Sequence, residues 1–212
     1  FDAYKEALSY KPDYAEAYNN LGHVLTHQNK SEEAIKAFNK ALSIYPDYAE
    51  SYYYKGNVLK DLEKFEEAID AYKNALSIKS LFPEAYNNNG LAFHALGKLD
   101  QAIGAFDKAI SIKPHYAEAF TNMGNVLKDK GKSEEAINAY HEALSIKPDF
   151  GLAHQNLSFV LLNEGQLQQG VEEYEWRWKN PENYSFKRHF NQPLWTGNEI
   201  LNNSRILVWG EQ

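Results

Sequence analysis

Apolar and small residues recur along this chain at helical spacing, and the whole pattern returns every 34 residues. In the first full repeat these positions are Ala17, Tyr18, Leu21, Gly22 and Leu25. Such spacing predicts a helix that begins near Ala15, and a second apolar face predicts another helix from about Ser31 to Ile44. A fixed period of this length is typical of a solenoid. The sequence therefore predicts an extended array of helix pairs rather than one globular core.

Small residues recur where two helices must cross closely. One site in each repeat holds Gly22, Gly56, Gly90, Gly124 and, in the fifth repeat, Ser158. Another holds Ala34, Ala68, Ala102, Ala136 and Gly170. A glycine inside a helix costs about 0.5–1 kcal/mol relative to alanine. Its recurrence in register indicates that close helix packing offsets this cost.

Proline and acidic residues mark the predicted helix boundaries. Proline lacks an amide donor and clashes with the preceding turn, so it ends the second helices. These prolines are Pro12, Pro46, Pro114 and Pro148. Pro83 is expected in the first turn of the third repeat, where proline is tolerated. Asp13 followed by Glu16 resembles a capping box, in which two side chains satisfy free amides at a helix start.

This combination of residues resembles the tetratricopeptide repeat. The shared pattern is aromatic, leucine and glycine in the first helix, then alanine, aromatic and alanine in the second, then proline. The second-helix aromatic residues are Phe38, Tyr72, Phe106, Tyr140 and Tyr174, followed by Ala41, Ala75, Ala109 and Ala143. The resemblance implies an all-α, right-handed α-solenoid of helix-turn-helix repeats with a short non-repeat C-terminal tail. Lys55 and Asn89 depart from it, because they stand where an apolar residue is usual.

We expect the chain to divide in register with this repeat. Residues 1–14 are interpreted as the second helix of a truncated repeat. Residues 15–48, 49–82, 83–116 and 117–150 are interpreted as four complete repeats, and residues 151–181 as a degenerate fifth. Residues 182–212 are interpreted as a linker and the first strand, residues 205–210, of a truncated downstream domain. The chain does not start with methionine, so we expect it to begin inside a longer protein.

The tail has a resemblance of its own. Its motifs are Tyr174-Glu-Trp-Arg-Trp178, Gln192-Pro-Leu-Trp195 and Ile206-Leu-Val-Trp-Gly-Glu-Gln212. They are similar to the junction at which bacterial tetratricopeptide proteins continue into a heptosyltransferase-like glycosyltransferase domain. This resemblance implies that the catalytic residues lie beyond residue 212. No catalytic dyad or phosphate-binding loop is complete in this chain, so we expect the chain itself not to be an enzyme.

Composition narrows the classes of partner. The formal net charge is −7 and the pI is near 5.5, so we expect no nucleic-acid binding. The chain has no cysteine, which excludes disulfides and zinc thiolates. No apolar run approaches the roughly 20 residues needed to span a bilayer, and the first residues do not resemble a signal peptide. We therefore expect a cytoplasmic protein with no membrane span.

Asparagines form the sharpest candidate binding feature. One repeat position holds Asn20, Tyr54, Asn88, Asn122 and Asn156, and the position three residues later holds His23, Asn57, Leu91, Asn125 and Phe159. The ladder resembles that in the superhelix of O-linked N-acetylglucosamine transferase. The resemblance implies that the asparagines and Tyr54 line a concave face and bind an extended peptide, since an amide both donates and accepts hydrogen bonds. The alternative is that the asparagines cap or solvate the helix surface.

Other polar and aromatic groups have simpler interpretations. Helix-start charge stabilisation accounts for Glu16, Glu50, Glu84 and Glu118, although they could also form a rim for cationic partners. Positions 52–54 are three consecutive tyrosines; one of them packs as Tyr18 does, and the other two could be a binding hot spot or plain surface. His23 and His27 are four residues apart, but no third ligand follows at metal-site spacing. We expect no metal and no cofactor.

The predicted function is protein or peptide binding, as the substrate- or partner-recruiting arm of a larger bacterial protein. One alternative is the non-catalytic N-terminal part of a glycosyltransferase whose active site lies beyond residue 212. Another is an assembly scaffold that forms a homo-oligomer through its exposed ends, unless the tail folds back and packs its tryptophans on the fifth repeat.

Overall fold

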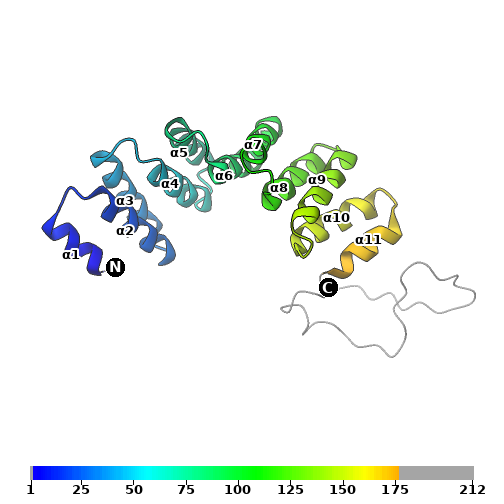
Figure 1. The fold of residues 1–212 in the computed structure, drawn as a ribbon, viewed down its shortest axis with the longest axis horizontal. Coiled ribbons are helices and arrows are strands. Elements are labelled where there is room, and N and C mark those ends of the chain that lie inside the picture. The colour runs from blue at the N-terminus through cyan, green and yellow to red at the C-terminus, as the bar shows by residue number, and fades with distance from the viewer. Residues whose placement is uncertain (1, 177–212) are drawn as a thin grey trace, which may run out of the picture.

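The computed structural model describes residues 2–176 of the 212-residue chain, and these residues form eleven α-helices with no strand among them. The helices are α1 (Asp2–Tyr10), α2 (Ala15–His27), α3 (Ser31–Ile44), α4 (Ala49–Asp61), α5 (Phe65–Ile78), α6 (Pro83–Ala95), α7 (Leu99–Ile112), α8 (Ala117–Asp129), α9 (Ser133–Ile146), α10 (Gly151–Asn163) and α11 (Leu167–Tyr174). They follow one another along an arch (Figure 1). The α-solenoid is confirmed, and α3 has the predicted bounds. The interpretation of residues 182–212, including a strand at residues 205–210, lies outside the described residues.

Each repeat is a pair of helices joined by one recurring turn. After α2, the amide of Lys30 donates to the carbonyl of Leu25 at 2.9 Å, and that of Asn29 donates to Thr26 at 3.0 Å. Asn29 itself has φ 59°, in the left-handed region that this turn requires. Glycine takes the same place in the last three repeats, at Gly97, Gly131 and Gly165, whereas the second repeat has Glu63 with φ 58°. This turn returns the second helix of each pair onto the first.

The predicted capping box is wrong. α2 begins at Ala15 with Tyr14 as its N-cap, and no side chain caps the helix by a hydrogen bond. The first helices of the later repeats start in the same way, after Tyr48, Phe82, Tyr116 and Phe150. A lysine ammonium lies over three of these rings, for example Lys113 at 4.2 Å from the centroid of Tyr116. Aromatic packing and cation–π contact therefore mark these helix starts, and Asp13 takes no part in a cap.

The recurring glycines allow each helix pair to close. A Cβ atom added at Gly22 would lie 2.7 Å from the ring of Phe38, and one at Gly124 would lie 2.6 Å from that of Tyr140. Gly56 and Gly90 face Tyr72 and Phe106 in the same way. All four aromatic side chains are fully buried. The predicted close crossing of the two helices is thus made by a glycine under an aromatic ring.

The fifth pair, α10 and α11, is built differently. Ser158 replaces the glycine and donates its hydroxyl to the carbonyl of Gly170 at 2.7 Å. His154 replaces an aromatic residue of the repeat, contacts Glu173 through Nδ1 and faces the carbonyl of Pro148 at 2.9 Å through Nε2. Its ring stacks on that of Trp176, with the centroids 3.9 Å apart. Polar contacts and a stacked tryptophan thus hold the last described pair.

The first helices of the repeats lie on the inner side of the arch. Contacts join α2 with α4, α4 with α6, α6 with α8 and α8 with α10, whereas no such contact joins consecutive second helices in the described range. Figure 1 accordingly shows α4, α6, α8 and α10 along the inner edge and α5 and α7 along the outer edge. Side chains that bridge neighbouring first helices therefore belong to the concave side.

Candidate peptide-binding surface

All seven residues of the predicted ladder lie on first helices and are partly buried. They are Asn20 on α2, Tyr54 and Asn57 on α4, Asn88 on α6, Asn122 and Asn125 on α8, and Asn156 on α10. The structure joins five of the six asparagines to neighbouring side chains by hydrogen bonds. Asn20 has no side-chain hydrogen bond to the rest of the described chain, and Tyr54 instead contacts His23 edge to face, with the ring centroids 4.8 Å apart.

The first hydrogen-bond network is centred on Asn57. Its Oδ1 accepts from the hydroxyl of Tyr72 on α5 and from Nδ2 of Asn88 on α6, both at 2.8 Å. Nδ2 of Asn88 also donates to the hydroxyl of Tyr53 at 3.3 Å. Because an amide oxygen has two lone pairs, the acceptor capacity of Asn57 is filled. This network links α4, α5 and α6.

The same network extends to α8 through a residue that sequence reasoning did not select. Nδ2 of Asn122 donates to Oδ1 of Asn87 at 2.9 Å, and Nδ2 of Asn87 donates to Oδ1 of Asn88 at 3.1 Å. Each amide therefore donates to the next, in the order Asn122, Asn87, Asn88 and Asn57, from α8 to α4. Asn87 is itself buried, with 6% of its surface exposed.

A second network repeats the central geometry two repeats later. Oδ1 of Asn125 on α8 accepts from the hydroxyl of Tyr140 on α9 and from Nδ2 of Asn156 on α10, both at 2.8 Å. Asn125, Tyr140 and Asn156 each lie 68 positions after the residue with the same role in the first network, which is Asn57, Tyr72 and Asn88 respectively. The polar surface thus has a period of two repeats.

The sequence contains a signal for this alternation. Among the four complete repeats, those with a tyrosine on the second helix have asparagine at the second ladder position, as in Tyr72 with Asn57, whereas the degenerate fifth has Tyr174 with Phe159. Repeats with phenylalanine have none, since Phe38 pairs with His23 and Phe106 with Leu91. A hydroxyl needs a polar partner when it is buried, and a phenyl ring does not. Reading the two positions together would have identified Tyr72 and Tyr140 as members of the networks.

Burial fixes the hydroxyls as donors. It raises the pKa of Tyr72 and of Tyr140 far above the usual range, because the charged form loses its hydration. Burial also raises the pKa of Tyr53, although the side chains of Asn57 and Asn88 act against that increase. All three tyrosines therefore remain protonated at neutral pH.

The remaining amide groups divide into closed and open ones. Within residues 2–176, the one buried side-chain nitrogen or oxygen atom without a hydrogen-bond partner is Oδ1 of Asn89. Amide atoms of the ladder that have no partner therefore reach solvent. They include Nδ2 of Asn125 and Oδ1 of Asn122 and Asn156. These groups are available to a ligand.

The glutamates of the predicted rim serve the array itself. Glu50 accepts from Lys79 at 2.9 Å, and this hydrogen bond is the main reason why the pKa of Glu50 is lowered. Glu84 lies 3.7 Å from Lys113 in the equivalent pair. Each pair joins the start of a first helix to the end of the second helix of the same repeat, so the charge-stabilisation interpretation suffices.

The aromatic and histidine residues near the N-terminal end pack on one another. The rings of His23 and His27 are 4.9 Å apart, and that of Tyr53 lies 4.8 Å from Phe82. In the part of the chain that the structure describes, no group of three or more His, Cys, Asp or Glu side chains could hold a metal ion. Nor does any helix there have the length and apolar character to cross a membrane.

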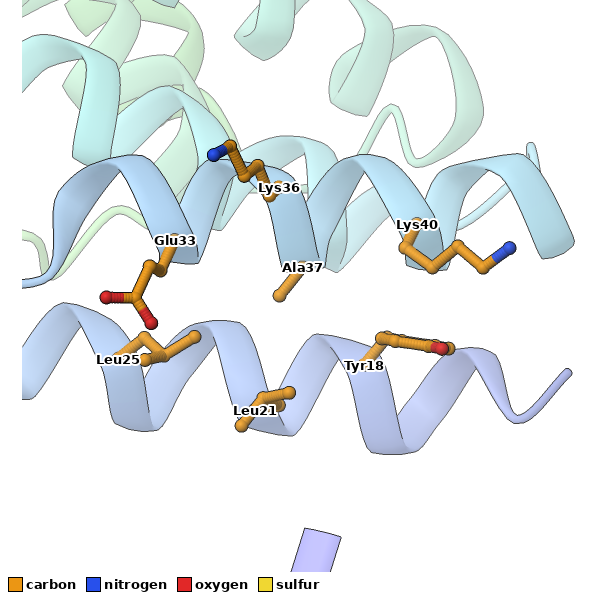
Figure 2. A pocket seen from close by; sticks show the side chains of 7 residues that line it. All are labelled: Tyr18, Leu21, Leu25, Glu33, Lys36, Ala37 and Lys40. Atoms are coloured by element: carbon orange, nitrogen blue, oxygen red, sulfur yellow. The ribbon is translucent and has the colours of Figure 1, made fainter. Parts of the chain in front are cut away.

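A groove of about 260 Å³ lies between α2 and α3. Its lining residues, shown in Figure 2, are Tyr18, Leu21, Leu25, Glu33, Lys36, Ala37 and Lys40. In the later repeats the preceding second helix packs against the first helix, as α3 does on α4. Here the preceding helix is α1, which has 9 residues where α3 has 14. Within the described residues, α1 contacts α2 but makes no such contact with α3, and no residue of α1 lines the groove.

Family comparisons agree with the repeat pattern. Models of the tetratricopeptide repeat match residues 15–48 and 117–150 and, in a second version, residues 37–70, and a TPR repeat model matches residues 56–97 and 90–131. Together they cover residues 15–150, which is more than half of the chain. The chain belongs to the tetratricopeptide repeat family. No family match includes the tail, so the glycosyltransferase resemblance at residues 174–212 has no support from this comparison, and no curated protein matches the chain.

Solved structures with this architecture span nearly the same length. A MamA protein is 25% identical with a TM-score of 0.70, and the match covers 84% of this chain and 98% of that one. YrrB, a TPR protein with an unusual peptide-binding site, is 21% identical with a TM-score of 0.68, over 86% and 94%. PilW, a type IV pilus biogenesis factor, is 18% identical with a TM-score of 0.77, over 84% and 83%. The last two show the fold alone; the family and the fold are those of protein-interaction scaffolds.

Proposed function

We propose that this chain binds an extended segment of a partner protein along the inner surface formed by its first helices. The observation that carries the proposal is the set of open amide groups on Asn122, Asn125 and Asn156, which neighbouring side chains hold in place on α8 and α10. An oriented amide can pair with a peptide unit without reading its side chain. The partner is therefore recognised mainly through its backbone.

Preorganisation supports this function. Each of the three asparagines already has its rotamer fixed by a hydrogen bond of 2.8 or 2.9 Å, so little side-chain entropy is lost when a ligand binds. YrrB has this fold and a peptide-binding site, which indicates that such a scaffold can hold a peptide. The wider role as the recruiting arm of a larger bacterial protein, in the cytoplasm, is part of this proposal.

A selection experiment tests the function. A library of random dodecapeptides is panned against the 212-residue chain, and the dissociation constants of enriched peptides are measured by fluorescence anisotropy. The variant N122A/N125A/N156A should weaken binding at least about tenfold, since several hydrogen bonds are lost together. The control is N39A/N74A/N138A, which removes exposed asparagines from α3, α5 and α9. Failure to enrich any peptide, or equal loss in both triple variants, would refute the function.

Self-association is a second candidate, and the groove between α2 and α3 favours it. The groove presents Tyr18 and Leu21, both partly exposed, at the first complete repeat. In later repeats a longer second helix of the same chain packs against the first helix. A second copy could supply that helix. Sedimentation velocity tests this, because L21E should abolish any dimer and leave peptide binding on α8 intact.

A further inference from the structure

The two halves of the asparagine ladder differ in what they offer a ligand. In the N-terminal half, Oδ1 of Asn57 accepts two hydrogen bonds, so that its Nδ2 alone is open. Both N–H bonds of Asn88 are used, toward Asn57 and Tyr53, and its Oδ1 accepts from Asn87. The oxygen of Asn88 is therefore already engaged, and Tyr54 stands on α4 where α8 has Asn122, so no open amide acceptor flanks Asn57.

In the C-terminal half, one side of each amide is left open. Asn125 has its oxygen filled by Tyr140 and Asn156, which leaves Nδ2 as a free donor. Asn122 and Asn156 each donate through Nδ2, to Asn87 and Asn125, which leaves their oxygens as acceptors. Because unpartnered amide atoms of this surface are not buried, these three groups face solvent.

The open groups form an alternating set. Asn122 and Asn125 are three residues apart on α8 and so lie on one helix face, presenting an acceptor beside a donor. Asn156 on α10 adds a second acceptor, joined to Asn125 at 2.8 Å. Acceptor, donor and acceptor complement the N–H, C=O and N–H groups of an extended peptide.

An apolar side chain lies next to this set. Phe159 is three residues after Asn156 on α10 and is 47% exposed. It occupies the repeat position at which Asn57 and Asn125 stand. Its ring is 6.2 Å from that of Tyr174, which supports it from α11. An exposed phenyl ring beside oriented amides can hold an apolar side chain of the same peptide.

We infer that peptide recognition is confined to α8 and α10, where Asn122, Asn125 and Asn156 bind backbone groups and Phe159 contacts an apolar side chain. The inference rests on the proposed function and specifies its ligand: an extended segment with free backbone N–H groups and an apolar residue, which excludes proline at the contacting positions. Tyr140 acts as a positioning residue, because its hydrogen bond leaves Asn125 with only its donor free. Asn57 and Asn88 hold the array together and do not contact the peptide.

The pair N125D and N57D tests this division on the 212-residue chain with peptides enriched from the dodecapeptide library. Each aspartate keeps an oxygen for its tyrosine and asparagine neighbours but turns the amide donor into a charged acceptor. The two sites share the local sequence Gly-Asn-Val-Leu-Lys-Asp, so the added charge meets the same surroundings along the helix. N138D on the outer helix α9 controls for net charge. Thermal melting of all three variants identifies any that does not fold.

N125D should weaken binding at least about tenfold, whereas N57D and N138D should stay within about twofold of the wild type. N-methylation of single backbone N–H groups of the peptide should weaken binding at one or two positions only. If peptides are enriched but N57D weakens them as much as N125D, or N125D has no effect, the confinement to α8 and α10 is overturned while peptide binding stands. If no peptide is enriched, the proposed function fails, and this inference fails with it.

Discussion

The hydroxyl of Tyr140 on α9 donates to Oδ1 of Asn125 on α8 at 2.8 Å. The ring beneath that hydroxyl is the one that covers Gly124, so the same side chain closes the helix pair and orients the amide above it. Packing and the candidate site are therefore coupled at a single residue. Tyr72 and Asn57 repeat this relationship two repeats earlier.

Replacing either tyrosine by phenylalanine should separate the hydrogen bond of the hydroxyl from the packing of the ring. Y140F and Y72F each keep the buried ring, but Oδ1 of Asn125 or of Asn57 then accepts one hydrogen bond fewer. Each should lower the free energy of unfolding by about 0.5–1.5 kcal/mol, the range for one hydrogen bond. Urea denaturation followed by circular dichroism measures this. Phe38 and Phe106 show that the ring alone fits the fold, so a loss above 3 kcal/mol would contradict the assignment.

The glycine beneath the ring should not tolerate a methyl group. G124A places a Cβ 2.6 Å from Tyr140, and overpacking of this kind costs about 1–3 kcal/mol. The matched control is G104A in α7, where a Cβ would have no atom within 4 Å. That change should stabilise the protein by about 0.5–1 kcal/mol, because alanine is the better helix former. Equal effects of the two substitutions on the thermal midpoint would be inconsistent with the glycine–aromatic contact.

The turn after α4 contains a removable strain. Glu63 has φ 58°, where a Cβ is unfavourable, and glycine fills this place in three other repeats. E63G should therefore stabilise the fold by about 0.5–1 kcal/mol, despite the greater freedom of glycine in the unfolded chain. Differential scanning calorimetry measures the change. E66G, an exposed position inside α5, is the control and should destabilise the fold by a similar amount.

The departure at Asn89 should be correctable. Asn89 is 6% exposed, and its Oδ1 has no hydrogen-bond partner, which costs about 1–3 kcal/mol. Leu21 and Leu157 stand at the same repeat position, so the site accepts leucine elsewhere in the array. N89L should raise the free energy of unfolding by about 1–3 kcal/mol. The exposed N39L in α3 is the control; a gain no larger at position 89 than at position 39 would argue against a buried orphan oxygen.

Stability should fall in alkaline solution because of the buried tyrosines. Burial raises the pKa of Tyr116 to about 12, and those of Tyr72 and Tyr140 are raised as well. The unfolded chain loses these protons near pH 10, before the folded chain does. The contribution is therefore complete below pH 10 and is lost as the pH rises toward 12. Denaturation midpoints between pH 9 and pH 11.5 should fall less steeply for Y140F than for the wild type.

Helix spacing, the 34-residue period and the recurrence of small residues were enough to predict the helix pairs, whereas the inner position of the first helices was implied by the resemblance to the tetratricopeptide repeat. These features repeat locally, and helical periodicity assigns residues to a face without knowledge of their neighbours in space. Pro83 at the start of α6 and the bounds of α3 follow from the same local rules.

Other features were decided by tertiary structure. The sequence identifies Asn88 and Asn156 as equivalent, yet only the packed array shows that Asn87 engages the oxygen of Asn88, whereas the oxygen of Asn156 stays open. The predicted capping box at Asp13 also failed, since α2 begins after Tyr14 and no side chain caps it by a hydrogen bond. Whether an amide atom has a hydrogen-bond partner depends on the atoms that other helices bring within about 3 Å of it. The spacing of residues along one helix does not determine those neighbours.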